Sequence, residues 1–243
     1  MCVAALAWQA HPRWRLIAIA NRDEFHDRPA APLARWAGSE IVAGRDLRAG
    51  GTWLGVTAAG RFGLVTNYRA EGYPRPELAS RGTLVTDWLN GQTPSGTPAM
   101  NPFNLFTADA ETAWFTTNLP HFAQHPLPTG IHSLTNGPFT QPWPKSLRLA
   151  EALQDWIAGP ATDPHQLFVP LADAELLGGT GPDPEFSGVF IRNPHYGTRC
   201  STVVAIAHDG TGTIAERRFT ADGSPAGETL ITLPERVTQG YSV

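Results

Sequence analysis

The residue with the clearest chemical potential is the cysteine that follows the initiator methionine. The side chain of Cys2 is small enough for Met1 to be removed, which leaves one residue with both a thiol and a free α-amino group. That amine has an unperturbed pKa of about 7.7–8.0 and the thiol one of about 8.5, so near neutrality the amine can accept the thiol proton. Cys2 can therefore supply a nucleophile and its own general base. The alternative interpretation of this single residue is a buried, unreactive cysteine.

A block of four polar residues, Asn21–Glu24, ends the second apolar segment of the chain. The apolar runs Val3–Trp8 and Trp14–Ala20 predict an N-terminal hairpin, which brings this block beside Cys2. A carboxylate there can hold the α-ammonium group, and a guanidinium can lower the thiol pKa or bind a carbonyl or carboxylate of a substrate. The alternative is a solvated turn that contains an arginine–carboxylate pair.

Several spaced motifs resemble a known family. The block reads Asn-Arg-Asp-Glu in a chain that starts Met-Cys, which is the motif for which the NRDE family is named, and that family includes the transport and Golgi organization proteins. The further motifs that carry the resemblance are Gly50–Gly55 (GGTWLG), Leu64–Tyr68 (LVTNY), Ser80–Gly82 (SRG), Ser133–Asn136 (SLTN), Pro142–Trp143 and Tyr196–Arg199 (YGTR). Together they span about residues 1–205, which is nearly the whole chain.

The family in turn is similar to the cysteine N-terminal-nucleophile hydrolases of the penicillin V acylase and bile salt hydrolase kind. The resemblance implies an α+β fold, a four-layer αββα sandwich with two antiparallel sheets between helices. It also implies a catalytic set in which Cys2 is the nucleophile. Asn67 resembles the asparagine that completes the oxyanion hole, Asn136 resembles a second asparagine near the nucleophile's amine, and Arg199 resembles the late active-site arginine.

The acidic partner of the amine is open between two neighbours. The similar hydrolases have Arg-x-x-Asp at the end of strand two, so ungapped alignment selects Glu24 and a shift of one residue selects Asp23. Alternation along a strand places Asn21 and Asp23 on one face and Arg22 and Glu24 on the other. We favour Asp23 as the catalytic carboxylate and assign Asn21, Arg22 and Glu24 to substrate binding.

The remaining elements predict a layered α+β domain, because strands flank a central pair of helices instead of alternating with them. The clearest helix is Pro144–Ala158, with Leu147, Ala150, Leu153 and Ile157 on its expected buried face. The other expected elements are a second hairpin of Thr52–Thr57 and Arg61–Tyr68, helices over Leu78–Asn90 and Pro164–Leu177, and strands over Leu105–Ala108, Thr112–Thr117, Ile131–Thr135, Gly188–Arg192, Ser201–His208 and Thr213–Thr220. We expect one domain over residues 1–243.

Composition excludes several classes of function. The net charge is −4 and no run of basic residues occurs, so nucleic acid and anionic membrane surfaces are poor partners. No apolar stretch is long enough to span a membrane, and the N-terminus lacks the pattern of a signal peptide, which predicts a cytoplasmic protein without membrane insertion. His121 and His125 lack the helical context of a zinc pair, and we expect no metal or cofactor.

Three functions compete at this point. The first is an amidohydrolase that cleaves a linear carbon–nitrogen amide bond of a small-molecule substrate, with the acyl chain in an apolar pocket. The second is a non-catalytic carrier of a hydrophobic ligand on the same fold, because members of the family are associated with lipid, acyl-CoA or haem handling. The third is a redox protein that uses Cys2 and Cys200; it lacks a Cys-x-x-Cys motif.

Overall fold

The first strand is apolar on both faces, and this dictates where its sheet must lie. In the computed structural model, which describes residues 2–94, 100–160, 162–179 and 183–233, β1 (Val3–Trp8) is buried along its whole length. Its even-numbered residues pack between two sheets, and its odd-numbered residues pack against helices. A strand covered on both sides belongs to an inner layer. Met1, whose removal is predicted, and residues 234–243 of the predicted domain lie outside the described residues.

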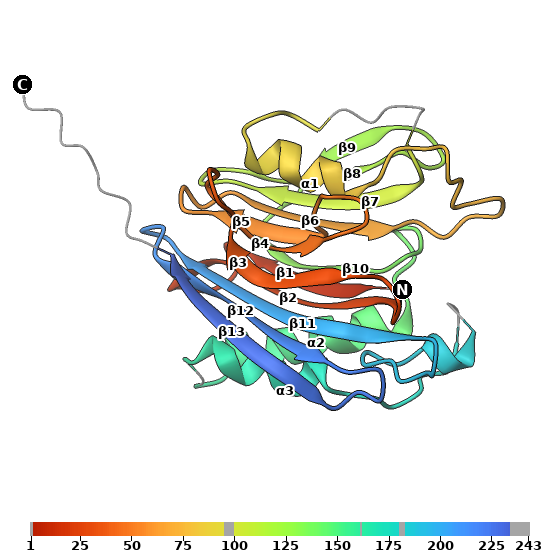
Figure 1. The fold of residues 1–243 in the computed structure, drawn as a ribbon. Helices are drawn as coiled ribbons and strands as arrows, with labels where there is room; N and C mark the ends of the chain where they lie inside the picture. The colour runs from red at the N-terminus through yellow and green to blue at the C-terminus, as the bar shows by residue number, and fades with distance from the viewer. Residues whose placement is uncertain (1, 95–99, 161, 180–182, 234–243) are drawn as a thin grey trace, which may run out of the picture.

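Two antiparallel sheets lie face to face with helices on both outer sides (Figure 1). The six-stranded sheet has the order β10 (Gly130–Leu134), β1, β2 (Trp14–Phe25), β11 (Tyr196–Ala207), β12 (Gly212–Phe219) and β13 (Pro225–Leu233). The seven-stranded sheet has the order β3 (Ala30–Arg35), β4 (Ile41–Asp46), β5 (Leu54–Thr57), β6 (Phe62–Asn67), β7 (Phe103–Ala108), β8 (Ala113–Thr117) and β9 (Ala123–Pro126). The predicted α+β sandwich is therefore confirmed.

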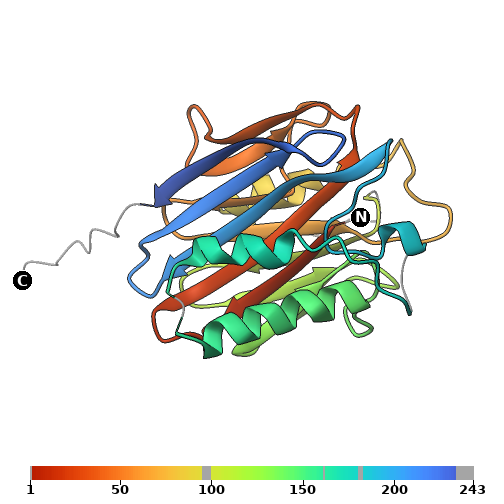
Figure 2. The same ribbon diagram turned by 90° about the horizontal axis from the view of Figure 1, so that it is seen from below.

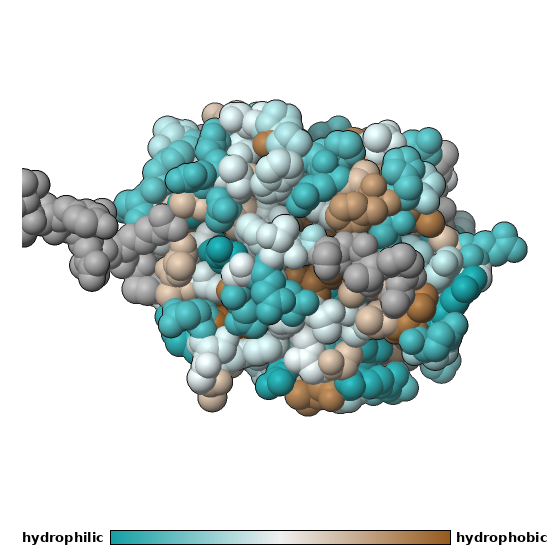
Figure 3. Space-filling model, turned by 90° about the horizontal axis from the view of Figure 1, so that it is seen from above, coloured by the Kyte–Doolittle hydropathy of each residue, from teal (hydrophilic) through white to brown (hydrophobic). Residues whose placement is uncertain are grey.

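The helices cover the outer faces of the sheets. One apolar cluster fills the space between the sheets, and two more lie beneath the helices. Helix α1 (Gly82–Leu89) packs on the seven-stranded sheet, whereas α2 (Pro144–Ala158) and the short α3 (Phe168–Leu171) cover the six-stranded sheet (Figure 2). Seen from the α1 side, the drawn surface is mostly hydrophilic, with apolar residues in separate small patches (Figure 3). No helix within the described residues is long and apolar enough to cross a bilayer.

The long β2 strand connects the fold to the candidate site. It continues five residues beyond the predicted end at Ala20, so that the polar block is part of a strand and keeps its alternation. The residues Asn21, Arg22 and Asp23 are buried, and Glu24 is half-buried. The polar block is therefore not a solvated turn.

Several predicted elements differ from the observed ones. The helix predicted to extend to Leu177 ends with α3 at Leu171 after a 3₁₀ turn at Pro164–Leu167, and the strand predicted at Gly188–Arg192 is reduced to one bridge from Arg192 to Gly197. The strands β3, β4, β9 and β13 were not predicted. Among them β3 and β13 contain Pro32 and Pro225, the kind of residue that weakens a strand signal and is tolerated at a sheet edge.

Helix α2 has the predicted bounds but a different buried face. Its buried residues include Leu149, Leu153 and Trp156, whereas Leu147 is 46% exposed. Both stripes fit a helical period and share Leu153, so periodicity alone does not separate them. The observed stripe also buries Lys145, a residue type that rarely lies on an apolar face without a partner.

Candidate active site

A cavity of about 290 Å³ lies between the two sheets, at the end where β2 carries the polar block. Ten of its 24 lining residues are arginines or acids. The lining residues are Cys2, Arg22, Asp23, Glu24, Arg28, Ala30, Ala31, Pro32, Gly44, Arg45, Asp46, Thr52, Trp53, Val65, Asn67, Ser80, Arg81, Gly82, Arg199, Cys200, Glu216, Arg218, Phe219 and Ala226. We name this cavity the Cys2 pocket. Its charged lining differs from the apolar pocket that the sequence led us to expect.

Both cysteines flank one arginine in the wall of the pocket. Cys200 pairs with Arg22 across β11 and β2, and Val3 pairs with Asn21 across β1 and β2, which puts Cys2 next to Arg22 on the other side. Both thiols are buried. Burial raises the pKa of Cys2, although the backbone of Asp23 acts in the opposite direction. Burial also raises the pKa of Cys200, to well above its ordinary value.

Asp23 lies on the opposite face of β2 from its neighbour Glu24 and is shielded from solvent. Thr198 Oγ1 donates a hydrogen bond of 2.7 Å to Asp23 Oδ1, and Lys145 Nζ lies 3.9 Å from Asp23 Oδ2. The Tyr196 hydroxyl donates to the Asp23 carbonyl at 2.7 Å. Burial raises the pKa of Asp23, whereas Lys145 and Thr198 act to lower it. These contacts fix the carboxyl in position and favour its charged form.

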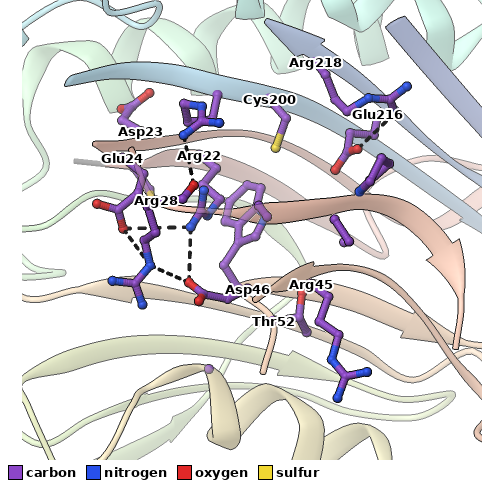
Figure 4. Close-up of a pocket in the computed structure, with 18 of the residues that line it drawn as sticks. Arg22, Asp23, Glu24, Arg28, Arg45, Asp46, Thr52, Cys200, Glu216 and Arg218 are labelled. Carbon is purple, nitrogen blue, oxygen red and sulfur yellow. Dashed lines mark hydrogen bonds and ion pairs between the residues drawn. The ribbon is translucent and has the colours of Figure 1, made fainter. Parts of the chain in front are cut away.

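Glu24 belongs to a different group of charges. Arg28 Nε lies 2.6 Å from Asp46 Oδ2, and Arg22 Nη2 lies 3.4 Å from the same oxygen. Glu24 Oε2 lies 3.8 Å from Arg22 and 3.7 Å from Arg28. Burial alone would raise the pKa of Asp46, but the hydrogen bond from Arg28 holds it below its ordinary value. Figure 4 shows this four-residue network on one side of β2 and the Asp23 carboxylate on the other.

The two predicted asparagines are linked, but only one lines the pocket. Asn67 is at the end of β6 and contributes to the pocket wall. Asn136 is buried behind it, where its Nδ2 donates a hydrogen bond of 2.6 Å to the Asn67 carbonyl. Asn136 is therefore placed to hold the backbone of Asn67 and not to contact a ligand in the pocket directly.

The remaining predicted residues have mainly structural contacts. Arg199 lines the pocket. Its Nη1 donates hydrogen bonds to the carbonyls of Phe25, His26 and Arg28 at 2.9, 3.0 and 3.2 Å, and these bonds hold the turn after β2 in place. Asn21 is not among the lining residues. Its amide is hydrogen-bonded to the carbonyls of two segments on the helical side, so the geometry does not support its predicted role in substrate binding.

Comparison with known proteins identifies the family. The model of the family described as Transport and Golgi organisation 2 matches residues 1–221. The chain belongs to this family. It is 29% identical over 260 residues to the Transport and Golgi organization protein 2 homolog of Homo sapiens, covering 89% of this chain and 92% of that protein. The homolog of Mus musculus is 27% identical over 261 residues with the same coverage. The resemblance inferred from the sequence motifs is confirmed.

Solved structures of two hydrolases share the fold of this chain. The Caenorhabditis elegans N-acylethanolamine-hydrolyzing acid amidase ortholog superposes with a TM-score of 0.53 at 13% identity, covering 95% of this chain and 100% of that one. The C2A mutant of the conjugated bile acid hydrolase from Clostridium perfringens gives 0.52 at 9% identity, with 95% and 92% coverage. The fold of this chain is thus of the N-terminal-nucleophile hydrolase type.

Sequence reasoning missed several charged residues of the site. Lys145 is the only lysine of the chain, and it is 1% exposed beside Asp23. A sole lysine near the start of a strongly predicted helix was the available signal. Asp46 ends β4 and Glu216 lies within β12, neither in a recognisable pattern, and only the folded arrangement brings them to the pocket. Among the described residues, no group of three His, Cys, Asp or Glu side chains is arranged to hold a metal ion.

The close packing of two family motifs explains their glycines. A Cβ atom on Gly51 would lie 2.7 Å from the carbonyl carbon of Gly82, so the Gly50–Gly55 and Ser80–Gly82 segments touch through their backbones. Real Cβ atoms do not approach backbone so closely. This contact fixes the start of α1 against the strand side of the pocket, and with it the position of Arg81.

Proposed function

We propose that the chain is a cysteine N-terminal-nucleophile amidohydrolase that cleaves a linear amide bond after removal of Met1. The observation that carries the proposal is the position of Cys2, in the wall of a cavity between the sheets and beside the buried Asp23. Because burial raises the pKa of the thiol, solvent does not ionise it at neutral pH and a base must act locally. The α-amine of the processed residue is such a base.

The chemical steps follow from this arrangement. The amine takes the thiol proton as Sγ forms a bond to the amide carbon, and the carbonyl becomes an oxyanion. The side-chain amide of Asn67 is proposed as a donor to that oxyanion. The ammonium group then protonates the leaving nitrogen as the carbon–nitrogen bond breaks, which leaves a thioester on Cys2. Water, deprotonated by the amine, attacks the thioester and releases the acid and the thiol.

Asp23 is proposed as the carboxylate that holds the amine. Its carboxyl group is buried with Thr198 and Lys145, whereas Glu24 is occupied by Arg22 and Arg28. Thr198 and Lys145 favour the charged form of this carboxyl group against the effect of burial, and in that form it can orient an ammonium group. We therefore propose Asp23 and not Glu24 for this role, which is also the residue that strand alternation favoured.

Intact mass and turnover test the proposal together. The purified protein should lack the mass of one methionine, and a panel of N-acyl amides should include members that wild type cleaves but Cys2→Ser and Cys2→Ala do not. A substrate that is cleaved slowly should leave an acyl adduct on Cys2. Asn67→Ala should lower kcat by about 10²–10³-fold. Retention of Met1, or equal cleavage by wild type and Cys2→Ala, contradicts the hydrolase assignment.

A hydrophobic-ligand carrier is the outcome if no amide is cleaved and an apolar ligand binds wild type and Cys2→Ala equally. The charged lining of the pocket does not favour this second candidate. The cavity, at about 290 Å³, is also at the lower limit of small-molecule sites, which span roughly 300–1,000 Å³. We therefore retain the hydrolase as the proposed function.

A further inference from the structure

The charge of the Cys2 pocket indicates what kind of molecule it receives. Six arginines and four acidic residues line it, which is a formal excess of positive charge in a chain whose net charge is −4. Its volume of about 290 Å³ is small for a long acyl chain. A small, arginine-rich cavity is complementary to a small anion.

Three of these six arginines are already neutralised by carboxylates of the protein. Arg22 and Arg28 share Asp46, and Arg218 Nη1 lies 3.3 Å from Glu216 Oε1. Figure 4 shows these pairs with their charged ends directed toward one another. A guanidinium held by an internal carboxylate offers little attraction to a further anion, because the two protein charges already compensate each other.

Two more arginines are engaged by backbone or by aromatic rings. Arg199 donates to three carbonyls of the turn after β2. Arg45 Nε donates to the carbonyl of Gly50 at 3.0 Å, and its guanidinium lies over the ring of Trp36 in an exposed position. Both therefore have structural roles at the rim or in the wall.

Arg81 is different. It is half-buried, lines the pocket, and its Nη1 has a hydrogen bond of 3.4 Å to the Pro102 carbonyl. Within the described part of the chain, no carboxylate oxygen lies within 4 Å of its guanidinium nitrogens. Burial lowers the pKa of Arg81, and Arg28 lowers it as well, whereas Cys2 and Glu24 act to raise it. Arginine stays protonated in proteins, so this is a partly desolvated cation that an anion would stabilise.

The position of Arg81 is fixed, which suits a recognition residue. It immediately precedes Gly82, whose backbone packs against Gly51 with no room for a side chain. The neighbouring Ser80 also lines the pocket. A guanidinium on a fixed backbone can bind a planar oxyanion with two parallel hydrogen bonds and lose little side-chain entropy.

We propose that Arg81 binds an anionic oxygen group of the substrate, a carboxylate or a phosphate, so that the amide cleaved at Cys2 belongs to a small, negatively charged molecule. That the bound molecule is a substrate rests on the proposed hydrolase function, but the anion site itself does not. The pocket thus selects against long neutral acyl amides by size and by charge, because a neutral group would leave the guanidinium desolvated and unpaired.

A binding experiment tests the anion site without any turnover. In a Cys2→Ala background at low ionic strength, succinate and inorganic phosphate are titrated calorimetrically into the parent and into Arg81→Gln. We expect the parent to bind at least one of them and Arg81→Gln to bind it about 10–100-fold more weakly. Arg81→Lys, which keeps the charge but loses the planar fork, should lie between them. The anion whose affinity falls more in Arg81→Gln relative to the parent shows whether Arg81 recognises a carboxylate or a phosphate.

The matched control is Arg75→Gln, which removes the same charge from an exposed position outside the pocket. It should bind the anions like the parent, and thermal melting should show that all variants are folded. Equal affinity of Arg81→Gln and parent, equal losses in Arg75→Gln and Arg81→Gln, or no binding of either anion to the parent overturns the proposal.

A kinetic experiment separates this inference from the proposed function. Short amides are compared as free carboxylates, as phosphates and as neutral methyl esters. Arg81→Gln should raise KM for the charged substrates about 10–100-fold and leave KM for the neutral ones unchanged. If anions bind through Arg81 but no amide is cleaved, the hydrolase proposal fails and the anion site stands. The opposite result is that both enzymes cleave neutral amides with equal KM and that wild type does not prefer charged amides to neutral ones. In that case the anion-site proposal fails and the hydrolase proposal stands.

Discussion

The buried pair of Lys145 and Asp23 allows a quantitative prediction about the core of the candidate site. Their charged atoms are 3.9 Å apart, and the exposed fractions of the two side chains are 1% and 0%. Lys145→Met keeps the length of the side chain but leaves the carboxyl group without this cation. Removal of one partner of a buried ion pair costs about 3–5 kcal/mol of stability. For a protein of this size each kcal/mol lowers Tm by about 2–4 °C, so Tm should fall by roughly 6–20 °C.

A double-mutant cycle isolates the pair from other effects of the substitution. Asp23→Asn alone leaves the ammonium group of Lys145 buried without this carboxylate, whereas the double variant leaves neither charge. The destabilisation of the double variant should therefore be smaller than the sum of the single ones by at least about 1 kcal/mol. Urea denaturation provides the free energies of unfolding. Strictly additive effects, or a Tm for Lys145→Met within about 2 °C of wild type, would refute the reasoning.

The pH dependence of stability provides a second, independent test of the interaction between Lys145 and Asp23. The pKa of Asp23 is raised above its unfolded value of 3.8, chiefly by burial, so its protonated form contributes stability that is present below 3.8 and lost as pH rises through the folded pKa. Lys145 acts to lower that folded pKa, so its removal raises it further. The penalty of Lys145→Met should therefore be smallest near pH 4 and grow toward neutrality. The pKa of Lys145 itself is lowered by burial, so its own contribution is complete above 10.5 and declines as pH falls through its folded pKa. A penalty that is independent of pH between 4 and 7 would contradict an electrostatic origin.

Three further predictions concern packing and thiol reactivity. Leu149→Ala should destabilise the protein by about 2–5 kcal/mol in urea denaturation, whereas Leu147→Ala on the exposed face of α2 should change it by less than about 0.5 kcal/mol; similar values would contradict the observed orientation of the helix. Gly51→Ala should shift the start of α1, because its Cβ would lie 2.7 Å from the carbonyl carbon of Gly82. It should therefore weaken phosphate or succinate binding in the calorimetric assay. Unchanged affinity and Tm would count against this contact. Burial and Glu216 raise the pKa of Cys200. Iodoacetamide should therefore label Cys200 slowly in the native protein at pH 7 and rapidly after unfolding, as measured by mass spectrometry. Fast labelling of the native protein would be inconsistent with the burial of this thiol.

The sequence by itself determined the family and the fold class, and most of the residues that it singled out as candidates line the Cys2 pocket. Cys2, the polar block after the second strand and the motifs along the chain were sufficient for this, because short motifs that form turns or close backbone contacts can be recognised without coordinates. Strand alternation also predicted that Asp23 and Glu24 lie on opposite faces of β2, as they do, since successive side chains of a strand point to opposite faces. The period of α2 gave its bounds but not its orientation.

The tertiary structure alone decided which charges meet. Lys145 reaches Asp23 from a helix more than a hundred residues away, and Asp46 joins Arg22 across the gap between two sheets. No local pattern encodes such pairs, because the partners belong to elements that are brought together only when three apolar clusters are buried at once. For the same reason the sequence predicted an apolar pocket, whereas the fold gathers arginines there and leaves Arg81 without a carboxylate among the described residues.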